Sequence, residues 1–191
     1  MTMTLGKSLI PAWRPLVVLW LLGAGLAPIA GYGAEPARET AGFFDQSFGN
    51  IREELQAARS DGKLGMVIMF DDEDCPWCQK MKATILTQAR VQEYYRKHFR
   101  VIHLDVKGDA PVTDLSGKEM AQKDFAFLRH RVRATPVFVF LDLDGQAINR
   151  YTGASKDADE FLLLAEFVVS GAYKTGNFVA YKRQKLSGAA K

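Results

Sequence analysis

Cysteine is scarce in this sequence, which has only two, at positions 75 and 78, among 191 residues. A secreted protein that uses disulfides as scaffolding usually has several well-separated pairs. A link between Cys75 and Cys78 would close a loop of only four residues. In the chain-entropy account, so short a loop contributes little to stability. A purely structural disulfide is therefore the weaker interpretation of the pair.

Histidine is also sparse, and this limits the metal chemistry of the cysteine pair. Covalent haem attachment requires a His directly after the second Cys, and position 79 is Gln. A structural zinc site needs four ligands, usually from two such pairs. The three histidines, His98, His103 and His130, are not close to the cysteines in sequence. We expect no metal and no organic cofactor.

Strong charge and repetition are absent too. The formal net charge is +3, and no long basic stretch is interleaved with aromatic residues, so nucleic-acid binding has little support. There are no internal repeats or low-complexity tracts, which argues against solenoids and disordered linkers. With 48% hydrophobic residues, the chain can bury the core of one domain of ordinary size.

The first 33 residues have the composition of a secretory signal. Lys7 and Arg14 precede the apolar stretch Leu16–Ala30, and small residues follow it. The apolar stretch is shorter than the ~20 residues that span a bilayer. Cleavage after Gly33 or Ala34 is expected, which would place the protein in the periplasm. The alternative is an uncleaved anchor that leaves the protein membrane-bound and facing the periplasm. An exported protein meets an oxidising environment.

The rest of the chain shows helical and strand patterns in alternation. A helix is expected over about residues 47–60, with Phe48 and Ile51 on its apolar face and Asp45 or Ser47 as its cap. Apolar runs predict buried strands and one hairpin, over Leu64–Phe70, Phe99–Val106, Val137–Leu141 and Ala147–Tyr151. Further helices are expected in two stretches between Pro76 and His98, over about Glu119–His130 with Met120, Phe125 and Leu128 inward, over Asp157–Ser170, and in the tail near Phe178. Residues 107–118 are expected to form a polar connection.

This order of elements indicates the fold class. Alternating strands and helices imply a parallel sheet covered on both faces, and the terminal hairpin adds antiparallel strands. The prediction is an α/β fold, a three-layer α/β/α sandwich with a mixed central sheet.

The predicted fold places Cys75 where a buried strand passes into a helix. There the unpaired N–H groups and the positive end of the helix dipole favour a thiolate. Pro76 suits the first helical position. Cys78 lies about one turn further on, expected to be more buried, so Cys75 is assigned as the nucleophile and Cys78 as the resolving thiol.

These motifs together resemble thioredoxin-fold proteins over roughly residues 45–170. The resemblance rests on the strand MVIMF, on CPWC at a helix start and on the later segment RATPVFVFLDLDGQ. It implies that Thr135-Pro136 is a cis bond facing the cysteines, whereas the local sequence alone fits a Pro that opens a strand equally well. The expected organisation is a signal (1–33), an N-terminal extension (34–46), a thioredoxin-like domain (47–172) and a tail with a short helix (173–191).

A narrower resemblance is to the periplasmic thioredoxin-related proteins of bacterial sulfur-oxidation clusters, called SoxW-type. It rests on the export signal, on the Pro-Trp dipeptide within CPWC and on the tail SGAYKTGNFVAYKRQ. The chain departs from thioredoxin in having Pro-Trp between its cysteines. Met69 also stands where thioredoxin keeps a buried acid that helps to deprotonate the resolving thiol. If that correspondence holds, Asp71, Glu73 or water must replace the acid.

The resulting hypothesis is an exported enzyme, a thiol–disulfide oxidoreductase that reduces periplasmic proteins bearing disulfides. Pro76, Trp77, Thr135 and Pro136 are the candidate substrate-binding residues, with Thr135 pairing to an extended segment. Trp77 is alternatively a half-buried packing residue. The expected partners are those substrate proteins and a membrane-bound electron donor, and a monomer is expected. The alternatives are an oxidase or isomerase with the same residues, or a non-catalytic binding module.

Four acids, Asp71 to Asp74, directly precede Cys75. The simplest expectation is a solvated loop. Their negative field would nevertheless oppose the helix dipole and raise the pKa of the nucleophilic thiol. A less stabilised thiolate would bias the couple towards reducing its targets.

Overall fold

The computed structural model describes residues 42–188. The expected signal at residues 1–33 lies outside the described residues, so its prediction stays a prediction. The described chain forms helices, short turns and strands in this order: α2 (Ile51–Ser60), β1 (Gly65–Asp71), α3 (Pro76–Thr84), α4 (Ala89–His98), β2 (Phe99–Asp105), β3 (Pro111–Thr113), β4 (Glu119–Ala121), α5 (Gln122–Asp124), η1 (Phe125–Arg129), β5 (Val137–Asp142), β6 (Ala147–Thr152), α6 (Ala158–Val169), η2 (Ala172–Lys174) and α7 (Phe178–Gly188).

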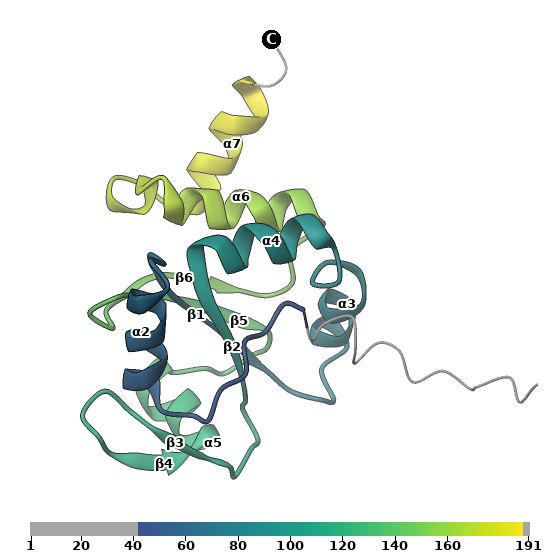
Figure 1. Cartoon of the computed structure of the whole chain (residues 1–191). Helices are drawn as coiled ribbons and strands as arrows, with labels where there is room; N and C mark the ends of the chain where they lie inside the picture. The colour runs from purple at the N-terminus through teal and green to yellow at the C-terminus, as the bar shows by residue number, and fades with distance from the viewer. Residues whose placement is uncertain (1–41, 189–191) are drawn as a thin grey trace, which may run out of the picture. The chain divides into compact units, whose positions relative to one another are not determined.

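The central sheet is mixed, as predicted, with the strand order β2-β1-β5-β6. Strand β1 is parallel to β2 and antiparallel to β5, and β5 is antiparallel to β6. Helices α4 and α6 lie along one face of the sheet and α2 lies on the other (Figure 1). This is a thioredoxin-like α/β fold. The parallel register pairs Asp71 with Asp105, so the carboxyl ends of β1 and β2 lie side by side.

Strand β1 is buried over its full length and supplies both halves of the core. Because successive side chains point to opposite faces, Val67 and Met69 join one apolar cluster, which includes both cysteines. Ile68 joins a second cluster, against α2. Burial of each such side chain stabilises the fold by about 1.5–3 kcal/mol. At the start of β1, a Cβ on Gly65 would lie 2.0 Å from the Leu141 carbonyl oxygen, so this close pairing requires glycine.

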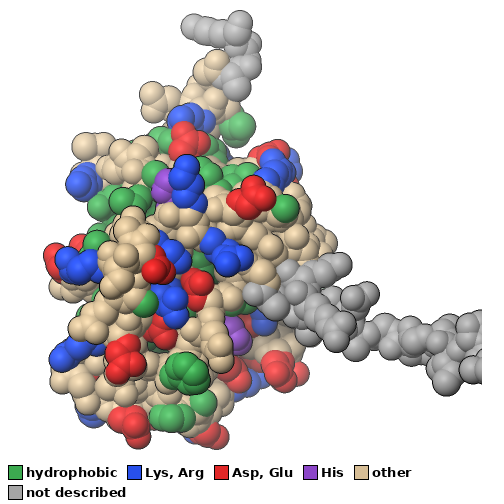
Figure 2. Space-filling view, in the orientation of Figure 1, with side chains coloured by type: hydrophobic (Ala, Val, Ile, Leu, Met, Phe, Trp, Pro, Cys, Tyr) green, Lys and Arg blue, Asp and Glu red, His purple; other side chains and the backbone are tan. Residues whose placement is uncertain are grey.

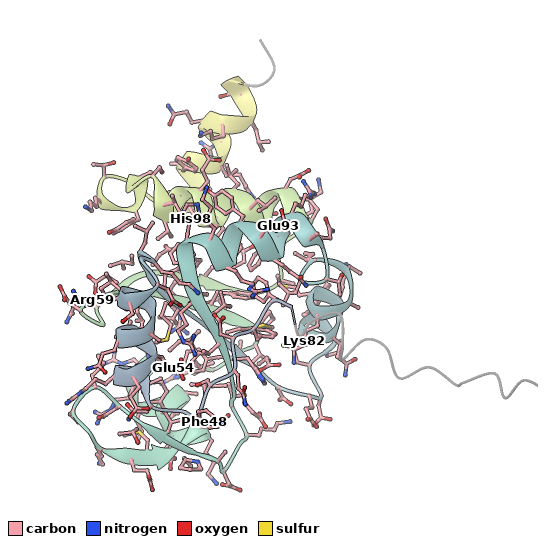
Figure 3. The ribbon with its side chains drawn as sticks, in the orientation of Figure 1. Phe48, Glu54, Arg59, Lys82, Glu93 and His98 are labelled. Carbon is pink, nitrogen blue, oxygen red and sulfur yellow. A yellow bond between two sulfur atoms is a disulfide. The ribbon has the colours of Figure 1, made fainter. Side chains whose placement is uncertain are left out.

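The first helix begins later than predicted. Asn50 caps α2, its side chain accepting a hydrogen bond from the Glu53 N–H, so the expectation that Asp45 or Ser47 forms the cap is wrong. Gly49 precedes the cap with a φ of +81°. Phe48 therefore lies outside the helix and is 87% exposed. It is labelled in Figure 3, and a hydrophobic patch occupies the same part of the surface in Figure 2.

The segment 107–130 also differs from the prediction. Within the expected polar connection, Pro111–Thr113 forms β3, which pairs antiparallel with β4. The expected helix over Glu119–His130 is therefore wrong at its start, and it continues as α5 and a single π-helical turn, η1. Phe125 is buried as predicted, but Leu128 is 61% exposed. The wider π turn changes the angular spacing of side chains, so the helical period does not predict which face Leu128 occupies.

Among residues 42–188, no helix is both long and apolar enough to cross a bilayer. The longest helix in this part of the chain, α6, instead packs against α4. The stacked rings of Tyr95 and Phe161, 4.5 Å apart, join these two helices. The Tyr95 hydroxyl donates a hydrogen bond to the Phe161 carbonyl oxygen at 2.8 Å.

Candidate active site

Cys75 caps the N-terminus of α3. Its backbone is extended, at φ −84° and ψ 109°, and its Sγ accepts a hydrogen bond from the Cys78 N–H at 3.1 Å. Pro76 occupies the first helical turn, where its missing N–H leaves no bond unmade. The sulfur therefore lies at the positive end of the helix dipole, as the sequence predicted. A thiolate at this position would be stabilised by both the dipole and the N–H donor.

Cys75 and Cys78 form a disulfide, with their Cα atoms 5.3 Å apart. Cys75 retains 8% of its surface exposed, whereas Cys78 is fully buried in the apolar cluster with Met81. The difference has the direction expected of an attacking and a resolving sulfur.

The segment before β5 completes the site. The Thr135-Pro136 bond is cis, as the resemblance implied. The Thr135 carbonyl oxygen lies 3.5 Å from the Cys75 Sγ, although 60 residues separate them. Pro136 is buried and Thr135 is partly exposed. An extended segment of another protein that paired with the backbone of Thr135 would thus lie beside the Cys75 sulfur.

Trp77 lies on the surface of α3, 59% exposed. The Lys80 Nζ is 5.4 Å from the centre of the Trp77 ring. The Trp77 ring is thus more exposed than buried, and its role as a substrate platform stays a prediction. Behind the helix start, the Gln79 side chain donates to the Glu73 carbonyl oxygen at 2.7 Å, which ties the preceding turn to α3.

Beneath α3, Met69 and Asp71 occupy the same face of β1. Met69 is fully buried in the cluster that contains the cysteines, so no carboxylate stands at that position. Asp71 is 3% exposed and forms an ion pair with Lys82 of α3, and the His103 Nδ1 of β2 lies 3.6 Å from its carboxylate. Lys82 is labelled in Figure 3. Burial alone would raise the pKa of the Asp71 carboxyl, but its hydrogen bonds to His103 and Lys82 outweigh burial and hold that pKa below its ordinary value.

The acidic turn is therefore not a uniformly solvated loop, and that expectation is wrong for Asp71. Asp72 and Asp74 are also paired, because the Lys107 Nζ lies 2.9 Å from one carboxylate and 3.0 Å from the other. Hydrogen bonds from Lys107 and from the Asp74 N–H lower the pKa of Asp72. Lys107 thus offsets part of the negative field next to Cys75.

Sequence reasoning missed Lys82, His103 and Lys107 as neighbours of the site. A signal for Lys107 was present. It follows the strand Phe99–Asp105, and the predicted parallel pairing brings the segment after that strand next to the acidic turn. Neither Lys82 nor His103 had such a signal, because a charged residue on an amphipathic helix or strand end is usually solvated. Among the described residues, no group of three or more His, Cys, Asp or Glu side chains is arranged to hold a metal ion.

Comparison with known proteins agrees with this geometry. The model of a thioredoxin-like domain matches residues 51–168, which is more than half of the chain. The chain therefore belongs to the thioredoxin-like family. A search of curated proteins gave no match.

Solved structures show the same fold. A thioredoxin-fold protein from Helicobacter pylori is 20% identical, with a TM-score of 0.59, and the match covers 78% of this chain and 94% of that one. A protein of Bacteroides thetaiotaomicron, described as a candidate disulphide isomerase, is 21% identical with a TM-score of 0.51, over 66% of this chain and 91% of that one. A thioredoxin from Thermus thermophilus is 28% identical, with a TM-score of 0.47, over 61% and 82%. The chain thus shares the thioredoxin fold with the first two of these proteins, and its own cysteine pair lies at disulfide distance.

Proposed function

We propose that this protein is an exported thiol–disulfide oxidoreductase that reduces disulfides in periplasmic proteins. The observation that carries the proposal is the convergence of two distant segments. Cys75 caps α3 with its sulfur 3.5 Å from the carbonyl oxygen of Thr135, next to a cis proline. This arrangement provides a nucleophilic sulfur, a second sulfur within reach, and a backbone edge on which a substrate can align.

The proposed reaction has two exchange steps. The Cys75 thiolate attacks one sulfur of the substrate disulfide, which forms a Cys75–substrate bond, breaks the substrate disulfide and releases one substrate thiolate. Cys78, after losing its proton, attacks the Cys75 sulfur. The Cys75–Cys78 bond forms and the second substrate thiolate leaves. Both released thiolates take protons from water, and two electrons have moved from the protein to its substrate.

A further turnover requires two electrons from a dithiol donor, which we propose is a membrane-bound protein. Export is supported by the composition of residues 1–33, and it is tested by fusing these residues to a reporter and fractionating the cells. A reporter that stays in the cytoplasm would rule out the exported form. The narrower kinship with SoxW-type proteins is also a proposal, supported by CPWC and by the tail.

The reduced protein should reduce a model protein disulfide in stoichiometric amounts, releasing thiols as Cys75 and Cys78 become oxidised. Cys75→Ser should abolish this reaction. Cys78→Ser should instead accumulate a mixed disulfide, because the first step proceeds and the second cannot. Release of thiols by Cys75→Ser at the wild-type rate would contradict the mechanism. A titration of the pair against glutathione gives its reduction potential, and a strongly oxidising value would assign the protein to disulfide formation instead.

A further inference from the structure

A groove opens next to the reactive sulfur, between the acidic turn and the segment that leads to Pro136. Its volume is about 250 Å³, and its lining includes Asp72, Lys123, Phe127, Val132, Arg133 and Thr135. At one end the Thr135 carbonyl oxygen lies 3.5 Å from the Cys75 Sγ. The wall formed by Asp72 is equally close to the site, because its carbonyl oxygen accepts a hydrogen bond from the Cys75 N–H at 3.1 Å. A segment aligned on Thr135 therefore reaches this groove with the side chains that flank its cysteine.

The charged residues of the groove are not equivalent. Asp72 forms an ion pair with Lys107 at 2.9 Å, and Lys123 forms one with Asp109. Arg133 is exposed, and within residues 42–188 it makes no ion pair or side-chain hydrogen bond. The groove thus presents one cation whose charge is not already matched by an internal partner.

The backbone fixes Arg133 at the rim of the groove. Arg131 has a φ of +49°, a conformation that L-residues seldom adopt, and it turns the chain after η1. Val132 then anchors the segment, since it is buried and its N–H donates to the Ala126 carbonyl oxygen at 3.0 Å. Pro136 is buried at the other end, so Arg133 stands between two anchored positions.

The groove also has an exposed apolar residue in its lining, Phe127. Phe127 of η1 is 53% exposed, whereas the two residues before it, Phe125 and Ala126, are buried. A guanidinium can bind a carboxylate through two parallel N–H donors, a fixed geometry that a lysine ammonium does not offer. The groove therefore has a cation, an exposed apolar residue and a position adjoining the reactive sulfur.

We propose that this groove is a specificity subsite that binds an acidic side chain, Asp or Glu, located beside the reactive cysteine of an extended substrate segment. Arg133 pairs with that carboxylate while the Thr135 backbone aligns the segment. The inference rests on the proposed function only in assuming that the bound segment carries the cysteine to be reduced. The subsite selects among substrates by the charge that flanks this cysteine.

Binding tests the subsite without thiol chemistry. The probes are short labelled peptides in which Ser replaces the reactive cysteine, with Glu, Gln or Lys at the neighbouring position, on either side in turn. Fluorescence anisotropy with the oxidised full-length protein at low salt should show that, in one of the two series, the Glu peptide binds about threefold to fivefold more tightly than the Gln peptide. The Lys peptide should bind most weakly. Arg133→Gln should remove the difference, whereas Arg183→Gln, which removes an exposed charge from α7, should preserve it. Equal affinities in both series, including no measurable binding of any peptide, overturn the subsite.

Reduction separates the subsite from the proposed function. Matching Glu, Gln and Lys peptides, in which the reactive cysteine is restored and is disulfide-linked to a chromophoric thiol, report attack by the reduced protein. A Glu preference in the second-order rate constant of this attack that disappears in Arg133→Gln supports the subsite. An equal loss of rate on all three peptides would assign Arg133 to the Cys75 thiolate and would overturn it. If no peptide is reduced but the Glu preference in binding persists, the proposed function fails and the subsite stands.

Discussion

At the scale of single residues, the two cysteines differ in their surroundings more than in their exposure. The Cys75 sulfur accepts a hydrogen bond from an N–H at the start of α3 and lies 3.5 Å from the carbonyl oxygen of Thr135, a residue that lines the groove. Cys78 is enclosed by the apolar side chains of its cluster, including Met69 and Met81. An N–H donor stabilises a thiolate, while an apolar environment disfavours one. The two thiols should therefore differ in pKa as well as in access.

We predict that in the reduced protein near neutral pH an alkylating reagent modifies Cys75 at least about tenfold faster than Cys78. The measurement is mass spectrometry of the labelled peptides over time. Cys75→Ser and Cys78→Ser, labelled separately, show whether each thiol keeps its rate without its neighbour. Equal rates, or faster labelling of Cys78, would reverse the assigned roles.

Asp71 is the second residue whose chemistry depends on its surroundings. Its folded-state pKa is lowered, so its stabilising contribution is complete above the unfolded value near 3.8 and is lost as the pH falls through the folded value. Asp71→Asn should lower the free energy of unfolding by about 1–3 kcal/mol at neutral pH, because Lys82 and His103 lose a charged acceptor. Urea titrations should show that this deficit shrinks as the solution is acidified below pH 3.8.

The control for Asp71 is Asp74→Asn, which neutralises an exposed carboxylate in the same turn. Its effect on unfolding should be small, since surface ion pairs contribute roughly 0–1 kcal/mol. A deficit for Asp71→Asn that is the same at acid and neutral pH would show that the loss comes from packing and not from charge.

At the scale of elements, the acidic turn and the segment after β2 act on the cysteine pair together. The turn directly before Cys75 has three negative charges, on Asp72, Glu73 and Asp74. The Lys107 ammonium, which is paired with Asp72 and Asp74, adds one positive charge to the same region. A negative field raises the pKa of a thiol, and a nearby cation lowers it. The two contributions therefore have opposite signs, and their balance tunes the couple.

We predict that replacing Asp72, Glu73 and Asp74 together with Asn, Gln and Asn lowers the pKa of Cys75 and raises the reduction potential by on the order of 10 mV at low salt. A more stable thiolate favours the reduced form, which is why the potential rises. Lys107→Gln, the matched change of opposite sign, should raise the pKa of Cys75 and lower the potential. Both are read from equilibration with glutathione at two salt concentrations. Shifts of the same sign in the two variants would rule out a field effect.

The elements also show where sequence patterns lose their predictive power. The central strands of the sheet could be predicted, because a short continuous run of apolar residues is typical of a strand that is buried on both faces. The pairing of Pro111–Thr113 with Glu119–Ala121 could not, because three-residue strands depend on tertiary contacts. One such contact is the hydrogen bond from the Thr113 N–H to the Gly49 carbonyl oxygen at 2.8 Å. Asp114 adds another, since its carboxylate accepts from the Ser116 and Lys118 N–H groups and pairs with Arg129.

The same distinction applies to the candidate site. The position of Cys75 at a helix start could be predicted, because a buried strand, a turn and Pro76 define it locally. The proximity of Thr135 required the family resemblance, since no local pattern joins residues so distant in sequence. The burial of Asp71 could not be predicted, because it depends on Lys82 and His103 arriving from two other elements.

At the scale of the whole molecule, the C-terminal helix continues the described fold beyond the region matched by the family model. Helix α7 contacts α6. The Phe178 ring lies 5.8 Å from both the Tyr151 and Phe167 rings. The Tyr181 hydroxyl donates to the Glu166 carboxylate at 3.0 Å. These contacts join α7 to β6 and α6, so we expect the tail to unfold together with the domain.

We predict that Phe178→Ala lowers the free energy of unfolding by about 1–2 kcal/mol, less than for a fully buried Phe because this side chain is only half-buried. Thermal unfolding should remain a single transition with its midpoint lowered by roughly 2–6 °C. Val179→Ala is the matched control, because Val179 is the next residue of the same helix and is exposed, so its midpoint should be nearly unchanged. Disulfide reduction should proceed at the wild-type rate in both variants, since neither residue lines the groove near Cys75. An unchanged midpoint in Phe178→Ala would instead mean that α7 unfolds independently of the thioredoxin-like domain.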